Sequence, residues 1–311
     1  MIRLYCAEEG VLKEVEQGDI KKALWIDFIA PSPEEVEMLH KEFDIALQDV
    51  ADCLDPNERA RVEIEESYDM LVMRALASEE RNGDRIQTMP IGIIVTSKKV
   101  VTVRIGATFS ASELTSDLRK KPWLETKEDL FLTLVRKVAR DIERKVRPME
   151  RNISYIQESI LGADGKKMAP DAFSLSNSLI ILNTSLLSNL NALSMISRMK
   201  HLKMTKDQLD IAEDLENDIA QLYETTTIYR EIMANILSAY ESAISNSLST
   251  VMKTLTTINL ILILPMLIAS LFSMNVGLPF EEYPHAFWMV TGLSAAAVIS
   301  LWVWFRYKRI L

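Results

Sequence analysis

The sequence has little of several residue types on which common enzyme and metal sites depend. It contains two cysteines, Cys6 and Cys53, and three histidines that are scattered along the chain. Two isolated thiols indicate neither a disulfide framework nor a zinc site. No Gly-rich phosphate loop and no Ser/His/Asp or Cys/His grouping is present. We therefore expect reduced thiols, no bound cofactor and a protein that is not an enzyme.

Basic residues are outnumbered by acidic ones, 35 to 44, so the chain carries a net charge of −9. A nucleic-acid-binding surface needs a basic stripe, so nucleic acid is excluded as a partner. The first ten residues, MIRLYCAEEG, lack the apolar core of a signal peptide. We expect most of the chain to stay in the cytoplasm.

Two long stretches near the C-terminal end lack charge altogether. Residues 254–280 and 285–305 contain no Asp, Glu, Lys or Arg. Each holds about 20 apolar residues, which is the length that an α-helix needs to cross a hydrocarbon core of about 30 Å. Buried core helices are the alternative, but uncharged runs of this length are rare in soluble domains. The pattern predicts two membrane spans.

The residues that flank these runs predict their orientation. Lys253 precedes the first run, and a basic tail, residues 306–311, follows the second. The loop between them has Glu281 and Glu282 but no Lys or Arg. The positive-inside rule then places both ends of the chain in the cytoplasm and the loop outside. We predict a multi-pass protein of the cell membrane.

The first third of the chain alternates strand-like and helix-like segments. IRLYC, VLKEV, LWIDFI, DMLVMRAL, PIGIIVTS and KVVTVRI are β-rich runs. SPEEVEMLHKEF starts with Ser32, Pro33 and then Glu35, which is the capping-box start of an amphipathic helix. Residues 1–120 are therefore predicted to form an α/β domain.

After Pro122 the strand signal disappears. KEDLFLTLVRKVARDIERKVRPMERNISYIQESIL has apolar residues at helical spacing, and its Pro148 either bends the helix or is tolerated as a kink. The segment GADGKKMAP breaks the pattern, and a second helix is expected over 171–200. Residues 121–205 are predicted to form a helical hairpin.

From Lys206 the helical pattern continues without Pro or Gly to Leu264 and enters the first apolar run. Unbroken to Met274, this helix has about 70 residues and is roughly 100 Å long. Such a helix is not stable alone, so we expect a bundle. Two spans cannot enclose a water-filled path, so ion transport requires several copies. The predicted segments are a stalk and first span at 206–274, an external loop at 275–285, a second span at 286–305 and a tail at 306–311.

The stretch YESAISNSLSTVMKTLT, followed by an apolar helix and then SMN, resembles the CorA family of divalent-cation channels. That family has a Gly-Met-Asn signature at the end of its first span, followed by a short acidic external loop. DCLDPNERARVEIEESYDMLVMRAL also looks like the family's N-terminal segment. The resemblance covers essentially the whole chain. It implies a homopentameric funnel that carries Mg²⁺, with Co²⁺ and Ni²⁺ as further candidate ions.

One position departs from the signature, because Ser273 stands where the family has Gly. Ser fits easily if the position is helical, whereas a positive φ would force the pore mouth to be rebuilt. Related branches with altered signatures, such as the zinc-transporting ZntB group, move other ions. A zinc transporter and a non-conducting membrane tether or sensor are therefore the alternatives. Neither span contains a charged residue that could relay protons, which favours passive transport.

The resemblance implies that Ser273, Met274 and Asn275 form the selectivity filter. Five Asn275 carboxamides would hydrogen-bond a hydrated Mg²⁺ without trapping it. Glu281 and Glu282 would concentrate cations outside by electrostatic focusing. The alternatives are a helix cap for Asn275 and simple solvation of the loop for the two glutamates.

The family's pattern also implies a row of pore-lining residues along the first span. Asn259 is the only carboxamide within the apolar run of that span, and an interhelical hydrogen bond is its alternative role. Met252 and Leu255 would form a hydrophobic constriction that gates by dewetting, although such residues are more often simple packing. The predicted set is Ser249, Met252, Leu255, Asn259, Ile263 and Met266.

The stalk carries a candidate sensor in DQLDIAEDLENDIAQLYE, residues 207–224, which has seven acidic residues and no basic one. Four of them share one helix face through spacings of 3, 4 and 4: Asp207, Asp210, Asp214 and Asp218. A divalent cation between adjacent subunits would relieve their repulsion and hold the bundle closed, so Mg²⁺ would be regulator as well as substrate. A solvated acidic face is the alternative. The candidate opposing ligands are Glu79, Glu80 and Asp84.

Overall fold

The computed structural model describes residues 1–8, 11–15, 20, 22–77, 86–105, 126–160, 162, 165–274 and 284–308. The chain divides into two compact units, Met1–Leu237 and Ser238–Leu311. The first unit holds both the α/β part and the helices that follow it, which the sequence analysis treated as separate segments. The long helix α7 contributes residues to both units.

The first unit is built on a sheet with the strand order β2-β1-β3-β7-β6-β5-β4. Neighbouring strands are antiparallel except β3 and β7, which run parallel. The predicted strand segments are confirmed, and β4 is an additional strand that was not predicted. The strands are β1 (Ile2–Glu8), β2 (Val11–Val15), β3 (Trp25–Ile29), β4 (Arg61–Ile64), β5 (Tyr68–Leu76), β6 (Thr88–Thr96) and β7 (Val100–Arg104).

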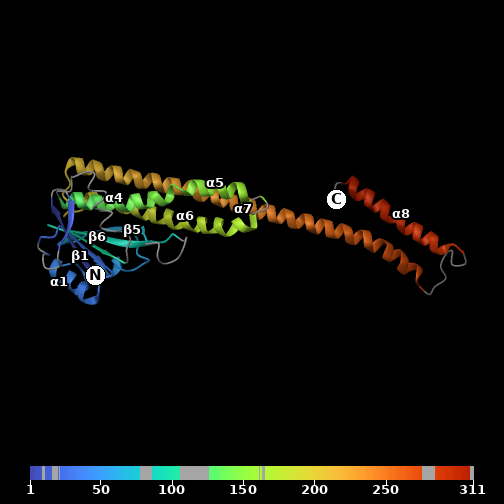
Figure 1. Cartoon of the computed structure of the whole chain (residues 1–311), viewed down its shortest axis with the longest axis horizontal. Coiled ribbons are helices and arrows are strands. Elements are labelled where there is room, and N and C mark those ends of the chain that lie inside the picture. Colours follow the sequence, from blue (N-terminus) through green and yellow to red (C-terminus); the bar gives the residue numbers. More distant parts are fainter. Residues whose placement is uncertain are drawn as a thin grey trace. The chain divides into compact units, whose positions relative to one another are not determined.

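Helices cover both faces of this sheet (Figure 1). Helices α1 (Pro33–Phe43) and α2 (Leu47–Cys53) lie on one face. Helices α4 (Lys127–Val146) and α6 (Gly165–Leu193) pack against β5 and β6 on the other. Strands that are buried on both faces become nearly continuous apolar runs, which explains the composition of β5 and β6.

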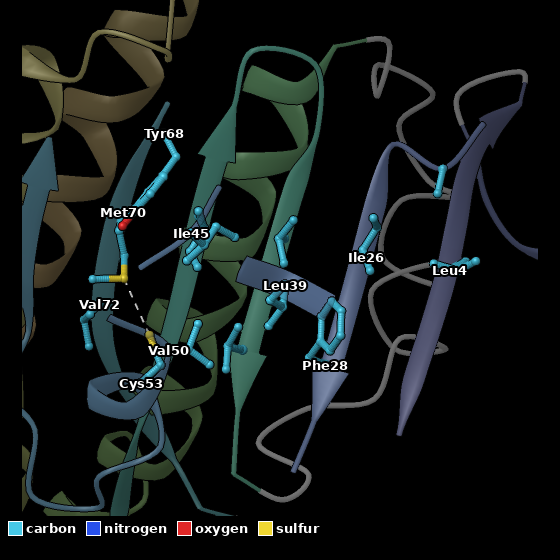
Figure 2. Close-up of a cluster of buried hydrophobic side chains, with 14 residues drawn as sticks. Leu4, Ile26, Phe28, Leu39, Ile45, Val50, Cys53, Tyr68, Met70 and Val72 are labelled. Carbon is cyan, nitrogen blue, oxygen red and sulfur yellow. Dashed lines mark hydrogen bonds between the residues drawn. The ribbon is translucent and has the colours of Figure 1, made fainter. Parts of the chain in front are cut away.

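The core beneath α2 depends on one glycine. Figure 2 shows Cys53 of α2 pointing at Met70 of β5, and the two sulfur atoms are 3.6 Å apart. A Cβ atom on Gly92 of β6 would lie 2.1 Å from the Cys53 sulfur, so only glycine allows α2 to approach this closely. Both cysteines are free, as predicted. Burial raises the pKa of the Cys53 thiol to about 12, which makes it chemically inert.

A buried ion pair joins the parallel strands β3 and β7. Asp27 is fully buried and Arg104 is 2% exposed, and the Arg104 Nη2 atom donates to Asp27 Oδ2 at 2.7 Å. Thr102 also donates to Asp27, and it accepts from the indole N–H of Trp25. This network satisfies polar groups on both strands and thereby fixes the register of the parallel pair.

The predicted capping box at the start of α1 is confirmed. The Ser32 hydroxyl accepts from the Glu35 N–H at 3.3 Å, and the Glu35 carboxylate accepts from the Ser32 N–H at 2.9 Å. These two bonds satisfy backbone donors that the first turn of a helix otherwise leaves open.

Two further capping boxes join the starts of α4 and α7 (Lys206–Phe272). Thr126 and Asp129 cap α4, while Thr205 and Gln208 exchange the corresponding bonds at the start of α7. The Gln208 amide also donates to Asp129 Oδ1 at 2.6 Å and to Thr126 Oγ1 at 3.2 Å. The two helices therefore begin side by side.

The helices between α4 and α7 differ in detail from the prediction. Helix α4 ends before Pro148 and α5 (Met149–Ile160) begins after it, so the proline breaks the helix because it lacks an N–H donor. Helix α6 begins at Gly165, earlier than the predicted Asp171, and ends before a short 3₁₀ helix, η2 (Ile196–Arg198). The predicted break at GADGKKMAP is therefore shorter than expected.

A buried polar layer holds α6 against α7 within the first unit. The Asn183 amide donates to Thr226 Oγ1 at 3.1 Å and to Thr227 Oγ1 at 2.7 Å. Arg230 in turn donates to the Asn183 carbonyl oxygen at 3.3 Å. Because a buried amide is costly unless it is hydrogen-bonded, this layer selects one register between the helices.

Candidate functional site: the C-terminal helices and the acidic face of α7

Three helices in the described part of the chain are long and apolar enough to cross a membrane: α6, α7 and α8 (Ala286–Tyr307). They differ in what covers them. Half of the apolar window of α6 is buried inside the protein, where α6 packs on β5 and α5. The corresponding shares are 6% for α7 and 0% for α8. The apolar surface of α6 is thus partly buried inside the first unit, whereas that of α7 and α8 is almost entirely exposed in the single chain.

One side of α7 faces α8 within the second unit. Among the described residues of that unit, Thr257 of α7 and Phe305 of α8 are the buried ones, with exposed fractions of 2% and 5%. Half-buried residues extend the Thr257 side along α7 at helical spacing. They are Ile261, Leu264, Pro265 and Ile268. Because α8 is the other described helix of this unit, we assign this less exposed stripe to the side of α7 that is nearer to α8.

The predicted pore-lining residues lie on the opposite side of α7. We define the Asn259 stripe as Met252, Leu255, Asn259, Ile263 and Met266. At 100° per residue its centre is about 180° from the centre of the stripe that faces α8. All five side chains are exposed in the single chain. The sequence spacing and the packing of α8 therefore place one continuous row on the free side of the helix.

The carboxamide of Asn259 has no hydrogen-bond partner in the described part of the chain. The interhelical hydrogen bond that the sequence analysis kept as an alternative role for Asn259 stays a prediction, since a helix of another copy could supply the partner. Ser249 lies about 80° to one side of the Asn259 stripe. It borders a hollow on the surface of α7 whose other lining residues are Glu241, Ser242, Ser245 and Asn246.

Ser273 adopts a conformation that suits serine. Its N–H donates to the Ala269 carbonyl at 3.0 Å, and its hydroxyl donates to the Ser270 carbonyl at 2.9 Å. Among described non-glycine residues only Ala30 and Asp44 have positive φ, so replacing the family's glycine with Ser273 introduces no backbone strain. Met274 is exposed. Asn275, Glu281 and Glu282 lie outside the described residues.

The acidic residues predicted as a sensor form an exposed face of α7 in the first unit. Asp207, Asp210, Asp214 and Asp218 are all exposed. Residues on the other side of the helix are buried, and they are Gln208, Ala212, Leu215 and Ile219. This division follows from helical periodicity and places the four carboxylates where a second molecule or a cation can reach them.

The sequence analysis missed a basic neighbour of this face. Burial lowers the pKa of Arg136 on α4, and Arg140 lowers it further, while Asp218 and Asp214 act in the opposite direction. The paired starts of α4 and α7 explain the proximity, since Arg136 is seven residues beyond Asp129. Sequence position alone contained no signal for it, because the two helices are far apart along the chain.

No three His, Cys, Asp or Glu side chains converge as a metal site within the described residues of the single chain. Glu79, Glu80 and Asp84, the predicted opposing ligands, lie outside the described residues. Among the described residues, the carboxylates of the acidic face come from α7.

Comparison with known proteins identifies the family. The profile described as CorA-like Mg²⁺ transporter protein matches residues 21–309. The chain belongs to this family. A cobalt/magnesium transport protein CorA from Methanocaldococcus jannaschii is 26% identical over 312 residues, with 96% of each chain covered. A protein of the same description from Thermotoga maritima is 22% identical and covers 83% of this chain and 74% of its own length.

Solved structures show that the fold is shared as well. The complete structure of the CorA magnesium transporter from M. jannaschii matches with a TM-score of 0.82 at 24% identity, covering 98% of this chain and 97% of that chain. The ZntB cytoplasmic domain from Vibrio parahaemolyticus matches with a TM-score of 0.63 at 11% identity, covering 78% and 98%. The chain is thus a CorA-family divalent-cation transporter with a soluble α/β part and long helices.

Proposed function

We propose that this protein is a passive Mg²⁺ channel, assembled from five copies, in which the Asn259 stripe of each copy faces a common water-filled axis. The observation that carries this proposal is the position of that stripe about 180° from the side of α7 that faces α8. A polar carboxamide within a membrane span usually faces a protein interior or an aqueous path. The names of the relatives, which include magnesium and cobalt transport, support the choice of ion.

In this assembly α7 and α8 are the two membrane spans, and α6 is part of the soluble unit. The chain ends are cytoplasmic and the loop at 275–285 is external. The basic residue Lys253 before the first span and the tail beyond the second span support this orientation through the positive-inside rule. Glu281 and Glu282 then raise the cation concentration at the outer mouth.

The chemistry of the outer end follows from the hydration of Mg²⁺. This ion gives up its water reluctantly and prefers octahedral oxygen ligands. A ring of Asn275 carboxamides hydrogen-bonds the hydrated ion and lets it leave again, as conduction requires. Ser273 and Met274 complete this filter, and the strain-free backbone at Ser273 supports an intact mouth.

The inner part of the pathway contains the gate. Met252 and Leu255 form a narrow apolar ring when five α7 helices come together, and such a constriction closes by dewetting. Ser249 lies on the cytoplasmic side of that ring. The acidic face of α7 acts as the sensor, because a divalent cation bound between subunits offsets the repulsion of Asp210, Asp214 and their neighbours.

Flux into proteoliposomes tests the channel. We expect Mg²⁺ uptake by the wild type and loss of uptake in Asn275→Ala. The matched control is Asn246→Ala, which removes a carboxamide from α7 outside the Asn259 stripe and should leave uptake unchanged. Leak-level flux of every divalent cation in the wild type identifies a non-conducting tether instead.

Ion choice is tested in the same assay by competition among Mg²⁺, Zn²⁺, Co²⁺ and Ni²⁺. Zinc transport is the second candidate, because the first unit also has the fold of the ZntB cytoplasmic domain. Zn²⁺ uptake that requires a proton gradient and is not reduced by Mg²⁺ contradicts the Mg²⁺ channel. For the sensor, the triple change of Asp210, Asp214 and Asp218 to Asn should leave the channel open at internal Mg²⁺ concentrations that close the wild type.

A further inference from the structure

A carboxylate and an imidazole meet inside the first unit with incomplete hydrogen bonding. Asp69 of β5 is fully buried, and His201 lies in the loop between η2 and α7. The His201 Nδ1 atom is 3.4 Å from Asp69 Oδ1. Within the described residues neither of these two atoms has a hydrogen-bond partner. The other oxygen of Asp69 accepts a hydrogen bond from the backbone N–H of His201.

The neighbouring charged side chains do not supply hydrogen-bond partners for Asp69 Oδ1 and His201 Nδ1 within the described residues. The Lys127 ammonium at the start of α4 donates to three carbonyl oxygens, those of His201 (2.6 Å), Thr96 (2.8 Å) and Ser97 (3.1 Å). Glu128 of α4 accepts from the backbone N–H of Lys203 at 3.3 Å. Among the described residues, Lys127, Glu128 and Lys203 are charged groups close to the pair, and Lys127 also interacts electrostatically with Asp69. In that part of the chain, His201 is the side chain that brings a nitrogen within 4 Å of Asp69 Oδ1.

Protonation of His201 satisfies both unpartnered atoms. A buried carboxylate oxygen without a donor is costly. An imidazolium has N–H groups on both ring nitrogens, so Nδ1 then donates to Asp69 Oδ1 as a charge-assisted hydrogen bond. A neutral imidazole either directs a lone pair at the carboxylate, with its proton on Nε2, or donates from Nδ1 without the positive charge that strengthens the bond of the imidazolium. Histidine changes its charge between pH 5 and 8 more readily than other side chains.

Because of its position, the pair can link the protonation of His201 to the start of α7. His201 begins the short segment that leads into the capping box of Thr205 and Gln208, where α7 starts. We propose that Asp69 and His201 form a proton-sensitive latch that ties the start of α7 to β5, closed at low cytoplasmic pH and weakened at high pH. The latch itself is independent of the transported ion, but its effect on transport rests on the proposed function.

A double-mutant cycle on the full chain in detergent tests the latch. Wild type, His201→Gln, Asp69→Asn and the double variant are unfolded thermally at pH 5.5 and 8.0. The latch stabilises the protonated state, so its contribution is present at low pH and lost as pH rises. The His201→Gln change should therefore lower Tm more at pH 5.5 than at pH 8.0, by about 2–4 °C. In the Asp69→Asn background this difference should vanish.

His40→Gln is the matched control, because His40 Nδ1 lies 2.9 Å from a backbone carbonyl oxygen, that of Ile45, and not from a carboxylate. Its effect on Tm should not depend on Asp69. Equal Tm losses for His201→Gln at both pH values, or a pH dependence that survives Asp69→Asn, overturns the proposal.

The wild type alone provides a readout where a variant fails to fold. Amide hydrogen exchange of the segment 199–208, corrected for the intrinsic effect of pH, should be slower at pH 5.5 than at pH 8.0. The segment 149–160 in α5 serves as the reference. Equal protection of 199–208 at both pH values contradicts the latch.

Flux separates the latch from the proposed channel. In proteoliposomes, wild-type Mg²⁺ uptake should change at least about fivefold between internal pH 6 and 8, while His201→Gln should not respond. A pH-sensitive latch with pH-independent flux removes the latch from gating. Absence of flux under all conditions contradicts the channel and leaves the stability result to decide the latch.

Discussion

The two units of the molecule place their apolar side chains in opposite ways. In Met1–Leu237 the apolar residues of β5 and β6 are covered on both faces by helices of the same chain. In Ser238–Leu311 most of the described apolar residues are exposed, and Phe305 is the apolar residue among them that is buried. A monomeric soluble protein rarely exposes so large an apolar surface.

This difference teaches where each unit obtains its stability. The first unit is stabilised by contacts that one chain supplies, including the Asp27–Arg104 pair and the core around Cys53. In the proposed assembly, lipid and other copies of the chain cover the exposed apolar surface of the second unit. The single chain therefore covers the apolar surface of its first unit but not that of its second. The following predictions test this contrast.

The largest effect is expected from breaking the buried ion pair of the first unit. Asp27→Asn removes the carboxylate charge that faces the buried Arg104 guanidinium and should cost about 3–5 kcal/mol of unfolding free energy. The exposed pair of Lys41 and Glu37 is the control, and Lys41→Met should cost about 0.3–0.5 kcal/mol. Denaturant unfolding of the full chain in detergent measures both. Similar losses for the two variants contradict the role given to Asp27.

A second change overfills the core beneath α2. Gly92→Ala places a Cβ atom against the Cys53 sulfur and should cost about 1–3 kcal/mol of unfolding free energy. Cys53→Ala removes the sulfur, so Gly92→Ala should cost less in that background. The same unfolding experiment on the four proteins gives the answer. An equal cost in both backgrounds shows that Cys53 is not what excludes a side chain at position 92.

A third prediction divides the exposed surface of the second unit into wet and dry sides. In a Cys6→Ser background, Asn259→Cys and Met266→Cys should react with a charged thiol reagent at least tenfold faster than Ile258→Cys, which lies about 100° from the centre of the Asn259 stripe. A tenfold ratio of rates corresponds to a difference of about 1.4 kcal/mol in activation free energy. The native Cys53 is buried and does not interfere, since burial raises its pKa to about 12. Mass spectrometry of protein in liposomes measures the rates. Equal rates at the three positions would falsify the assignment of the Asn259 stripe to a water-filled axis.

The smallest effect concerns one helix cap. Ser32→Ala removes the hydroxyl that accepts from the Glu35 N–H and should cost about 1 kcal/mol of unfolding free energy. Ser32→Asp keeps an acceptor at the cap and should retain most of the stability. Thermal unfolding of the three proteins measures the effect. Equal losses for the two variants indicate that the hydroxyl is not the stabilising group.

Local sequence patterns were sufficient for elements with a strong signal of their own. The capping box at Ser32, the apolar runs of β5 and β6 and the long periodic pattern of α7 each determine their structure within a few neighbouring residues. Strand β4 (Arg61–Ile64) is short and half-buried, so it has little apolar signal and was not predicted. Helix α2 has about two turns, which is too short for its periodicity to stand out.

The candidate site was predictable to the same extent. The spacing of Met252, Asn259 and Met266 places them on one face of a helix whatever surrounds it. The burial of Thr257 on the other side of α7 depends on residues outside that pattern and could not be predicted from the spacing. The same is true of Arg136 beside Asp214.

The sequence by itself determined which residues share a helix face or alternate along a strand, because these relations depend only on the geometry of one element. It also determined that two long uncharged runs lie near the C-terminal end, at 254–280 and 285–305. Only the tertiary structure decided what lies opposite each face. Asp69 and His201 are 132 residues apart along the chain, and they meet because the sheet and the start of α7 pack together, which no local pattern encodes.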